Sequence, residues 1–332
     1  MDRDERERIA AKRLLSVLGR HGAAIARTLE QKISDAGPFN QRIDPHILIP
    51  VRNDLVKMDL IRKIRAHGRD WFALPDTPPQ ILHDRIEEQA QVLHLATDNR
   101  FMHRLGDALE IAVFRALRSS GLNSLGGFRG LADAPTTGPQ KKEEPPSIFG
   151  AKELSGNRRF DFLVGTKLWA GIECKNIREW LYPDRPEIKQ MLLKAVELDI
   201  PPILIGRRIP FVTRRLLQPA GGLVWEIRSQ LYPTEYGNIA AQISHKDSLG
   251  FFDIRVTDYP DEKLLDFITR IIPAELPEAT DRFQQFKDLL DPYARGRMPY
   301  HVFAAKIRRR ENGTDEDRDD HDQPENPYDH LF

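Results

Sequence analysis

Two short apolar segments within residues 159–176 constrain this chain more than any other part of its sequence. The first reads Arg-Phe-Asp-Phe-Leu-Val and the second Gly-Ile-Glu-Cys-Lys-Asn, and both are rich in strand-forming residues. The segment between them, residues 165–167, is short enough for a hairpin turn and contains a glycine, which tolerates the backbone angles of a turn. Because side chains alternate along a strand, Glu173 and Lys175 share one face while Cys174 points to the other. The pattern predicts adjacent strands that bring two carboxylates and an ammonium together, those of Asp161, Glu173 and Lys175.

Two carboxylates and an ammonium at one sheet edge are costly to bury without a partner. A divalent cation is the natural partner, because carboxylate oxygens are ligands that such ions prefer. A lysine beside the ion would lie near the anionic group under attack.

This segment resembles the motif of the PD-(D/E)xK nuclease superfamily, which has the restriction-endonuclease-like fold. The resemblance implies that Asp161 and Glu173 bind Mg²⁺, for which Mn²⁺ can substitute. It also implies that the backbone carbonyl of Cys174 adds a metal ligand and that Lys175 is the catalytic lysine. The proline that usually precedes the aspartate is replaced by Phe160, a departure that the superfamily tolerates.

The order of elements around the motif supports the resemblance, because the superfamily has a helix, three strands, a helix and a fourth strand. Apolar residues at helical spacing, prolines in first turns and a continuous apolar run predict these elements. We expect helices over 98–120, 186–198 and 210–217, and strands within 122–131, at the motif, and over 202–206 and 222–227. The sequence therefore predicts an α/β protein with an αβββαβ restriction-endonuclease-like core, covered by helices on both faces of its sheet.

Three other residues are candidates for the site. The superfamily often places a glutamate of the first helix near the metal, and Glu110 is the candidate by position. The alternative is an ordinary solvated glutamate. Lys189 and Gln190 of the later helix could likewise face the site or belong to a solvated face. Taken alone, the motif also fits a structural hairpin with a surface Glu/Lys pair.

Residues 1–76 resemble a winged helix-turn-helix domain. Asp44 and Pro45 mark the start of its third helix as an N-cap and a proline in the first turn. A glycine-bearing turn between two strands predicts the wing. We expect helices over 9–18, 23–33 and 44–58, a loop at 37–40, and wing strands over 60–65 and 71–74 around a turn at 66–70.

In such modules the third helix enters the major groove and the wing contacts the DNA backbone or the minor groove. Residues 1–75 hold fifteen basic and ten acidic residues, an excess of the right sign. With Ile47, Val51, Leu55 and Met58 expected in the core, the side chains between them face outward. The expected DNA contacts are Arg52, Asn53 and Lys57 of the helix and Arg62, Lys63, Arg65 and Arg69 of the wing. The alternative is a protein-interaction or dimerisation module.

Composition suggests the remaining divisions of the chain. A nuclease domain is expected over 77–235 with a flexible proline-rich insertion at 133–157, followed by an α+β extension over 236–310 without a recognisable motif. The acidic tail 311–332 is expected to be disordered. Residues 1–310 carry 49 basic and 41 acidic residues, which suits a phosphate-bearing partner. One cysteine excludes an internal disulfide.

The sequence thus predicts a Mg²⁺-dependent endonuclease that hydrolyses DNA, acting in prokaryotic restriction or phage defence by resemblance to winged-helix fusions of this superfamily. The alternatives are a DNA-binding regulator or complex subunit with a nuclease-like scaffold, and a nuclease directed at RNA. Because no apolar run approaches the ~20 residues that span a bilayer, we expect a cytoplasmic protein without membrane contact. The sequence does not separate a monomer from a homodimer, nor decide whether a defence-system partner protein takes part.

Overall fold

The computed structural model describes residues 2–34 and 43–314, and the chain forms two compact units. Unit 1 comprises Met1–Met102 and Tyr236–Ile254, and unit 2 comprises His103–Glu235 and Arg255–Phe332. This division differs from the predicted domains, because residues 77–102 and 236–254 belong with the N-terminal unit. The predicted loop at 37–40 and all of the acidic tail beyond residue 314 lie outside the described residues.

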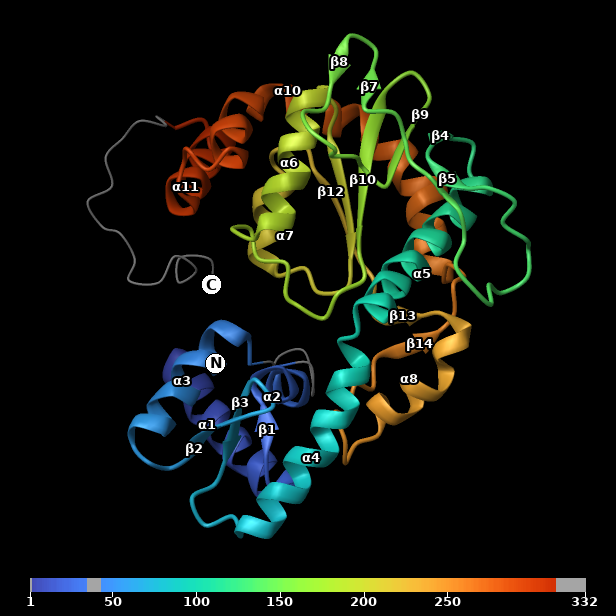
Figure 1. The fold of residues 1–332 in the computed structure, drawn as a ribbon. Helices are drawn as coiled ribbons and strands as arrows, with labels where there is room; N and C mark the ends of the chain where they lie inside the picture. Colours follow the sequence, from blue (N-terminus) through green and yellow to red (C-terminus); the bar gives the residue numbers. More distant parts are fainter. Residues whose placement is uncertain (1, 35–42, 315–332) are drawn as a thin grey trace. The chain divides into compact units, whose positions relative to one another are not determined.

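Unit 1 contains a helical bundle with a small antiparallel sheet, whose strands lie in the order β1-β3-β2 (Figure 1). Its core is built from buried aliphatic side chains of the first three helices and from Phe72. The elements are α1 (Arg3–His21), β1 (Ala24–Ile25), α2 (Ala26–Ile33), α3 (Pro45–Lys57), β2 (Arg62–Ala66), β3 (Arg69–Ala73), α4 (Pro79–Ala96) and α8 (Gly237–Ser244).

The second helix and the wing turn of unit 1 differ from the prediction. The helix expected over 23–33 begins at Ala26, because the two preceding residues form a strand that pairs with β3. The wing turn consists of His67 and Gly68 alone, with φ of 48° and 69°. Positive φ at both central residues is the geometry of a two-residue hairpin turn, so Ala66 and Arg69 belong to the strands.

Helix α4 belongs to unit 1 because one of its faces is buried there. Ile86, Gln89 and Leu93 are almost fully covered. The Gln89 side chain donates a hydrogen bond to the carbonyl oxygen of Ala23 at 2.7 Å. A buried polar group with a specific partner fixes a helix in place, so α4, which the sequence prediction placed in the nuclease domain, is part of the N-terminal unit.

Unit 2 is built on a five-stranded mixed sheet in the order β12-β11-β10-β9-β4. The first three of its strands along the chain, β4 (Asn123–Leu125), β9 (Phe162–Gly165) and β10 (Trp169–Lys175), are antiparallel neighbours. Next come β11 (Pro202–Gly206) and β12 (Leu223–Glu226), which run parallel to β10. With α5 (Asn99–Arg118), α6 (Pro186–Leu198) and α7 (Phe211–Leu217), the elements follow the predicted order, and the α/β class is confirmed.

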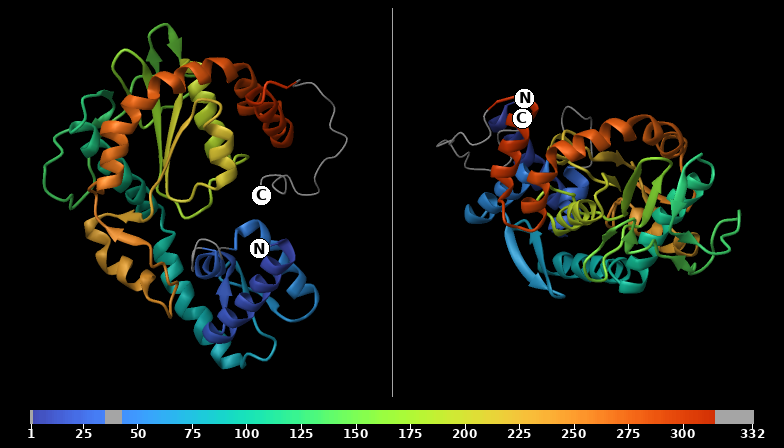
Figure 2. Two further views of the ribbon diagram at one scale, coloured as in Figure 1. Left: turned by 180° about the vertical axis from the view of Figure 1, so that it is seen from behind. Right: turned by 90° about the horizontal axis from the view of Figure 1, so that it is seen from above.

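Helices cover both faces of this sheet (Figures 1 and 2). One face packs on α6, α7, the later part of α10 (Ile272–Ala294) and α11 (Tyr300–Glu311). The other packs on α5, α9 (Glu262–Asp266), the π-helical turn Phe267–Ile271 and the start of α10. The helices after residue 255 therefore complete the sheet's own core and do not form the separate extension that the sequence predicted. None of the described helices combines the length and hydrophobicity needed to cross a bilayer.

The insertion at 133–157, predicted to be flexible, contains short strands. Strand β5 (Gly127–Phe128) pairs with β6 (Lys142–Glu143), and β7 (Ile148–Phe149) pairs with β8 (Lys152–Glu153). The remaining short elements are β13 (Gln230–Tyr232), the 3-10 turn Thr234–Tyr236 and β14 (Ile254–Val256).

The close approach of Phe160 to Gly171 gives a test of this packing. A Cβ atom at Gly171 would lie 2.4 Å from the ring of Phe160, which is itself buried. Gly171→Ala should therefore lower the free energy of unfolding by about 1–3 kcal/mol, the usual cost of overpacking. Gly121→Ala, at an exposed position with open space, is the matched control and should change it by less than about 0.5 kcal/mol. Equal denaturation midpoints for the two variants would contradict this packing.

Candidate functional site

The motif residues meet where β9 begins and β10 ends. Asp161 directly precedes β9, and its backbone N–H donates to the carbonyl oxygen of Ile172 at 2.9 Å. Its carboxylate Oδ2 accepts a hydrogen bond from the backbone N–H of Cys174 at 2.7 Å. This bond attaches the Asp161 side chain to the strand that carries Glu173 and Lys175.

Glu173 lies between two lysines. Nζ of Lys175 donates to Oε1 at 2.7 Å, and Nζ of Lys194 on α6 donates to Oε2. Lys194 also donates to the carbonyl oxygen of Arg159 at 2.8 Å. Burial alone would raise the pKa of Glu173, but the two ammonium groups outweigh it and hold this pKa below its usual value. The Glu173 carboxylate is therefore ionised and already compensated.

Lys142 of the insertion connects Asp161 to Glu110 on α5. Its Nζ lies 2.8 Å from Oε2 of Glu110 and 3.1 Å from Oδ1 of Asp161. The Glu110 side chain is 15% exposed. Glu110 therefore lies at the motif, as its position on the first helix predicted, and not on a solvated face.

The carboxylates influence one another's protonation. Burial and the charge of Asp161 raise the pKa of Glu110 to about 7. Burial and the charge of Glu173 also raise the pKa of Asp161 above its usual value. Burial would lower the pKa of Lys175, but the carboxylates of Glu173 and Asp161 outweigh it and raise this pKa. Lys175 is consequently a permanent cation at neutral pH.

The thiol of Cys174 is not a nucleophile candidate. Its side chain is buried, and burial raises its pKa well above the usual value. A thiol that stays protonated is poorly reactive. Only the backbone carbonyl of Cys174 therefore remains as a candidate metal ligand, as the resemblance implied.

Two lysines of the site were not predicted. Lys194 stands on the buried face of α6 beside Met191 and Leu198, and a lysine on an apolar face indicates a buried partner. Lys142 lies in β6, a strand of only two residues, where no periodicity connects it to the motif. The two predicted candidates on α6 are not among the side chains that contact the motif. Lys189 lies over the ring of Tyr293 at 5.4 Å, and Gln190 is exposed.

The predicted metal ligands are only partly assembled. Within residues 2–34 and 43–314, no three His, Cys, Asp or Glu side chains lie together as a metal-binding group. Glu173 is engaged by lysines, whereas Glu110 and Asp161 converge on one cationic atom. Oε2 of Glu110 is buried and lacks a well-directed hydrogen bond although the ammonium is close. Two such carboxylates suit a hard divalent cation, so Glu110 and Asp161 fit the predicted ion.

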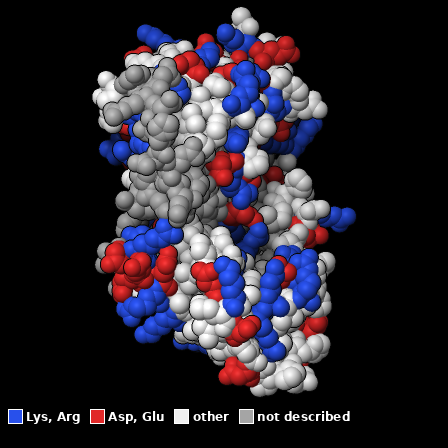
Figure 3. Space-filling view, turned by 90° about the vertical axis from the view of Figure 1, so that its left-hand side faces the viewer, with Lys and Arg blue, Asp and Glu red and all other residues white. Residues whose placement is uncertain are grey.

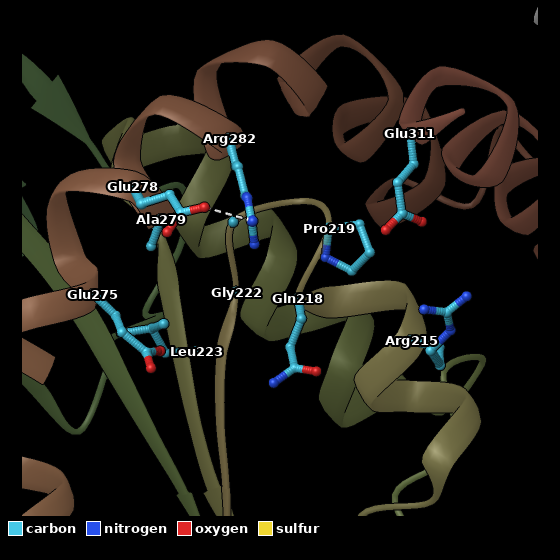
Figure 4. Close-up of a pocket in the computed structure, with 11 residues that line it drawn as sticks. Arg215, Gln218, Pro219, Gly222, Leu223, Glu275, Glu278, Ala279, Arg282 and Glu311 are labelled. Atoms are coloured by element: carbon cyan, nitrogen blue, oxygen red, sulfur yellow. Dashed lines mark hydrogen bonds and ion pairs between the residues drawn. The ribbon is translucent and has the colours of Figure 1, made fainter. Parts of the chain in front are cut away.

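A separate cleft of about 400 Å³ in unit 2 contains none of these residues (Figure 4). It is lined by parts of α7, β12, α10 and α11, with acidic and basic side chains on its walls. Two of these, Glu278 and Arg282, form an ion pair at 2.5 Å. The mixed and partly paired charges give this cleft no clear ligand preference.

Three of the seven predicted DNA contacts in unit 1, all arginines, are half-buried against the protein. The guanidinium of Arg52 lies over the ring of Phe72 at 4.8 Å. Arg62 donates to the carbonyl oxygen of Thr77 at 3.0 Å, and Arg69 donates to the hydroxyl of Thr97 at 3.1 Å. The side chains of these arginines pack against the surface of unit 1 itself, which makes them poor candidates for DNA contacts. The exposed four are Asn53, Lys57, Lys63 and Arg65.

The exposed bases of the wing have an acidic neighbour. Lys63 and Arg65 both pair with Asp70, at 2.8 and 2.9 Å. Exposed ion pairs contribute little free energy, so these side chains can exchange Asp70 for a phosphate.

Met58, expected in the core, is 58% exposed because α3 ends at Lys57. On the face drawn in Figure 3, basic and acidic side chains are interspersed.

Comparisons with protein-family models, with curated proteins and with solved structures found no match for this chain. The function therefore has to be inferred from the arrangement of the site's side chains.

The raised pKa of Glu110 predicts a pH dependence of stability. Between its ordinary value of 4.5 and about 7, the folded chain binds more protons than the unfolded chain. The free energy of unfolding without metal should therefore fall as the pH rises through this range. Glu110→Gln should remove this component, whereas the exposed Glu153→Gln should retain it. Chemical denaturation in chelator at several pH values measures the free energy of unfolding of each variant. If its dependence on pH is the same for Glu110→Gln and Glu153→Gln, the burial of Glu110 is contradicted.

Proposed function

We propose that the chain is a metal-dependent endonuclease of the PD-(D/E)xK type that hydrolyses phosphodiester bonds in DNA. The observation that carries the proposal is the convergence of Glu110 and Asp161 on one cationic atom beside the Glu173–Lys175 pair. The order α5, β4, β9, β10, α6, β11 and the directions of these strands add support, because the superfamily has this sequence of elements.

Each side chain of the proposed site has a separate role. Glu110 and Asp161, with the Cys174 carbonyl, would hold the ion. When bound, Mg²⁺ or Mn²⁺ lowers the pKa of a bound water and neutralises charge on the phosphate. Lys175 keeps its proton, so it would stabilise the negative charge that develops on the phosphate and would not act as a base. Lys194 is a positioning residue, since it contacts Glu173 and the main chain of Arg159.

A second candidate is a DNA-binding regulator or complex subunit in which the nuclease-like unit is a scaffold. The observation in its favour is that lysines neutralise the carboxylates, because structural ion networks also perturb pKa values. This candidate predicts that the chain does not cleave nucleic acid.

A cleavage assay separates the candidates. Supercoiled plasmid, single-stranded DNA and RNA are incubated with the full chain in Mg²⁺, in Mn²⁺ and in chelator. Asp161→Asn and Glu110→Gln keep the side-chain shapes but remove the charge of a proposed metal ligand, and each should lower the cleavage rate by at least about 10²-fold. Glu153→Gln, exposed on the insertion, is the matched control and should cleave like the wild type.

The same assay can contradict the proposal. Cleavage that continues in chelator, or at the wild-type rate in both site variants, rules out this mechanism. RNA cleavage without DNA cleavage would change the substrate and keep the mechanism. A purified chain that cleaves none of the three substrates favours the scaffold candidate.

We further infer that unit 1 binds DNA through α3 and the wing. The support is an exposed set of polar and basic side chains, Asn53, Lys57, Lys63 and Arg65. The exposed apolar side chains of Ile49, Met58 and Leu60, on or just after the same helix, favour instead a protein partner.

Salt dependence of binding distinguishes these two roles. The double substitution Lys63→Ala with Arg65→Ala should reduce the slope of log affinity against log salt by about one unit for each phosphate that the protein no longer neutralises. Lys12→Ala with Arg20→Ala removes two exposed bases of α1 and should leave the slope unchanged. If both pairs of substitutions reduce affinity equally, the wing does not bind the DNA.

A further inference from the structure

Lys142 occupies the point that Glu110 and Asp161 share. Its Nζ lies 2.8 Å from Oε2 of Glu110, 3.1 Å from Oδ1 of Asp161 and 3.6 Å from Oε1 of Glu144. A magnesium ion lies roughly 2.0–2.1 Å from its oxygen ligands. An ion bound by both carboxylates would therefore overlap the ammonium, and the two cations exclude each other.

The main chain around Lys142 is anchored independently of these carboxylates. Lys142 pairs with Phe128 in the β5–β6 ladder, and the Arg129 N–H donates to the carbonyl oxygen of Lys141 at 3.0 Å. Further back in the insertion, the Thr136 hydroxyl donates to the buried carboxylate of Asp258 at 2.6 Å. A lysine side chain is a point charge on a flexible four-carbon stem, so Nζ can leave while these anchors persist.

Charge dominates the interaction of Lys142 with the two carboxylates, although Nζ also donates a hydrogen bond to Oδ1 of Asp161 at 3.1 Å. Oε2 of Glu110 has no well-directed hydrogen bond, even though Nζ of Lys142 is within 2.8 Å. Burial would lower the pKa of Lys142, but the carboxylates of Asp161 and Glu110 outweigh it and raise this pKa. A compact cation of higher charge satisfies the same two carboxylates better than a singly charged ammonium.

We propose that Lys142 is a tethered competitor of the metal, which neutralises Glu110 and Asp161 in the metal-free chain and swings out when a divalent cation binds. Lys142 thereby sets the metal concentration at which the site fills. This inference rests on the metal site of the proposed function, but it concerns binding and does not require cleavage.

The test is calorimetric titration of the full chain with Mn²⁺, without nucleic acid. Lys142→Met removes the charge and keeps the length of the side chain, so it should bind Mn²⁺ about tenfold more tightly than the wild type, or better. Its thermal midpoint should be lower than that of the wild type without metal and should rise more on adding Mn²⁺. Lys141→Met changes the adjacent exposed lysine and should behave like the wild type in both measurements.

A second measurement uses the wild type and does not depend on how the variant folds. Amine acylation read by mass spectrometry should be slow at Lys142 without metal and several-fold faster in saturating Mn²⁺, because Nζ is released. Lys141 should react at one rate in both conditions. Unchanged acylation of Lys142 in saturating Mn²⁺ would overturn the inference.

The outcomes separate this inference from the nuclease proposal. If Lys142→Met binds Mn²⁺ no more tightly than the wild type, the competitor role is wrong and the nuclease proposal stands. If it binds more tightly but the chain cleaves no substrate, the competitor role stands and the nuclease proposal falls. If neither protein binds Mn²⁺, both are wrong.

Discussion

The hydrogen bond from the Cys174 backbone N–H to the Asp161 carboxylate, 2.7 Å long, is the interaction on which the rest of the site depends. It holds the carboxylate against the end of β10, next to Glu173. Two buried carboxylates this close together repel each other, and burial together with the charge of Glu173 raises the pKa of Asp161. The chain compensates with ammonium groups supplied by three separate segments, those of Lys142, Lys175 and Lys194.

This compensation explains why the site can be interpreted in two ways. A scaffold needs its buried charges paired permanently, whereas a metal centre needs some of them paired exchangeably. The ion pair of Glu173 with Lys194 is of the first kind, since Lys194 is buried and also bound to the main chain. In our proposal the ion pair of Lys142 with Glu110 is of the second kind, and it is supported by the partial exposure of the lysine side chain and the lack of a well-directed hydrogen bond to Oε2 of Glu110.

Local sequence patterns were enough to predict the elements that carry the motif. Continuous apolar runs located β9, β10 and β11, and helical spacing located α5 with Glu110. The sequence did not predict Lys142, because its proximity to Asp161 arises from a pairing between two-residue strands that have no periodicity. It also missed that the helices after residue 255 complete the core of unit 2, since packing of distant segments leaves no local signal. The contacts of Arg62 and Arg69 within the protein were missed because their partners, Thr77 and Thr97, lie outside the predicted module.

The central claim is that Glu110 and Asp161 form a divalent-cation site. Crystals of the chain grown without metal and then soaked in Mn²⁺ test it most directly, because the anomalous signal locates the ion. The account predicts an anomalous peak within bonding distance of both carboxylates, with the Lys142 side chain turned away from them. Saturating Mn²⁺ that leaves no peak there, with Lys142 still between Glu110 and Asp161, would contradict it.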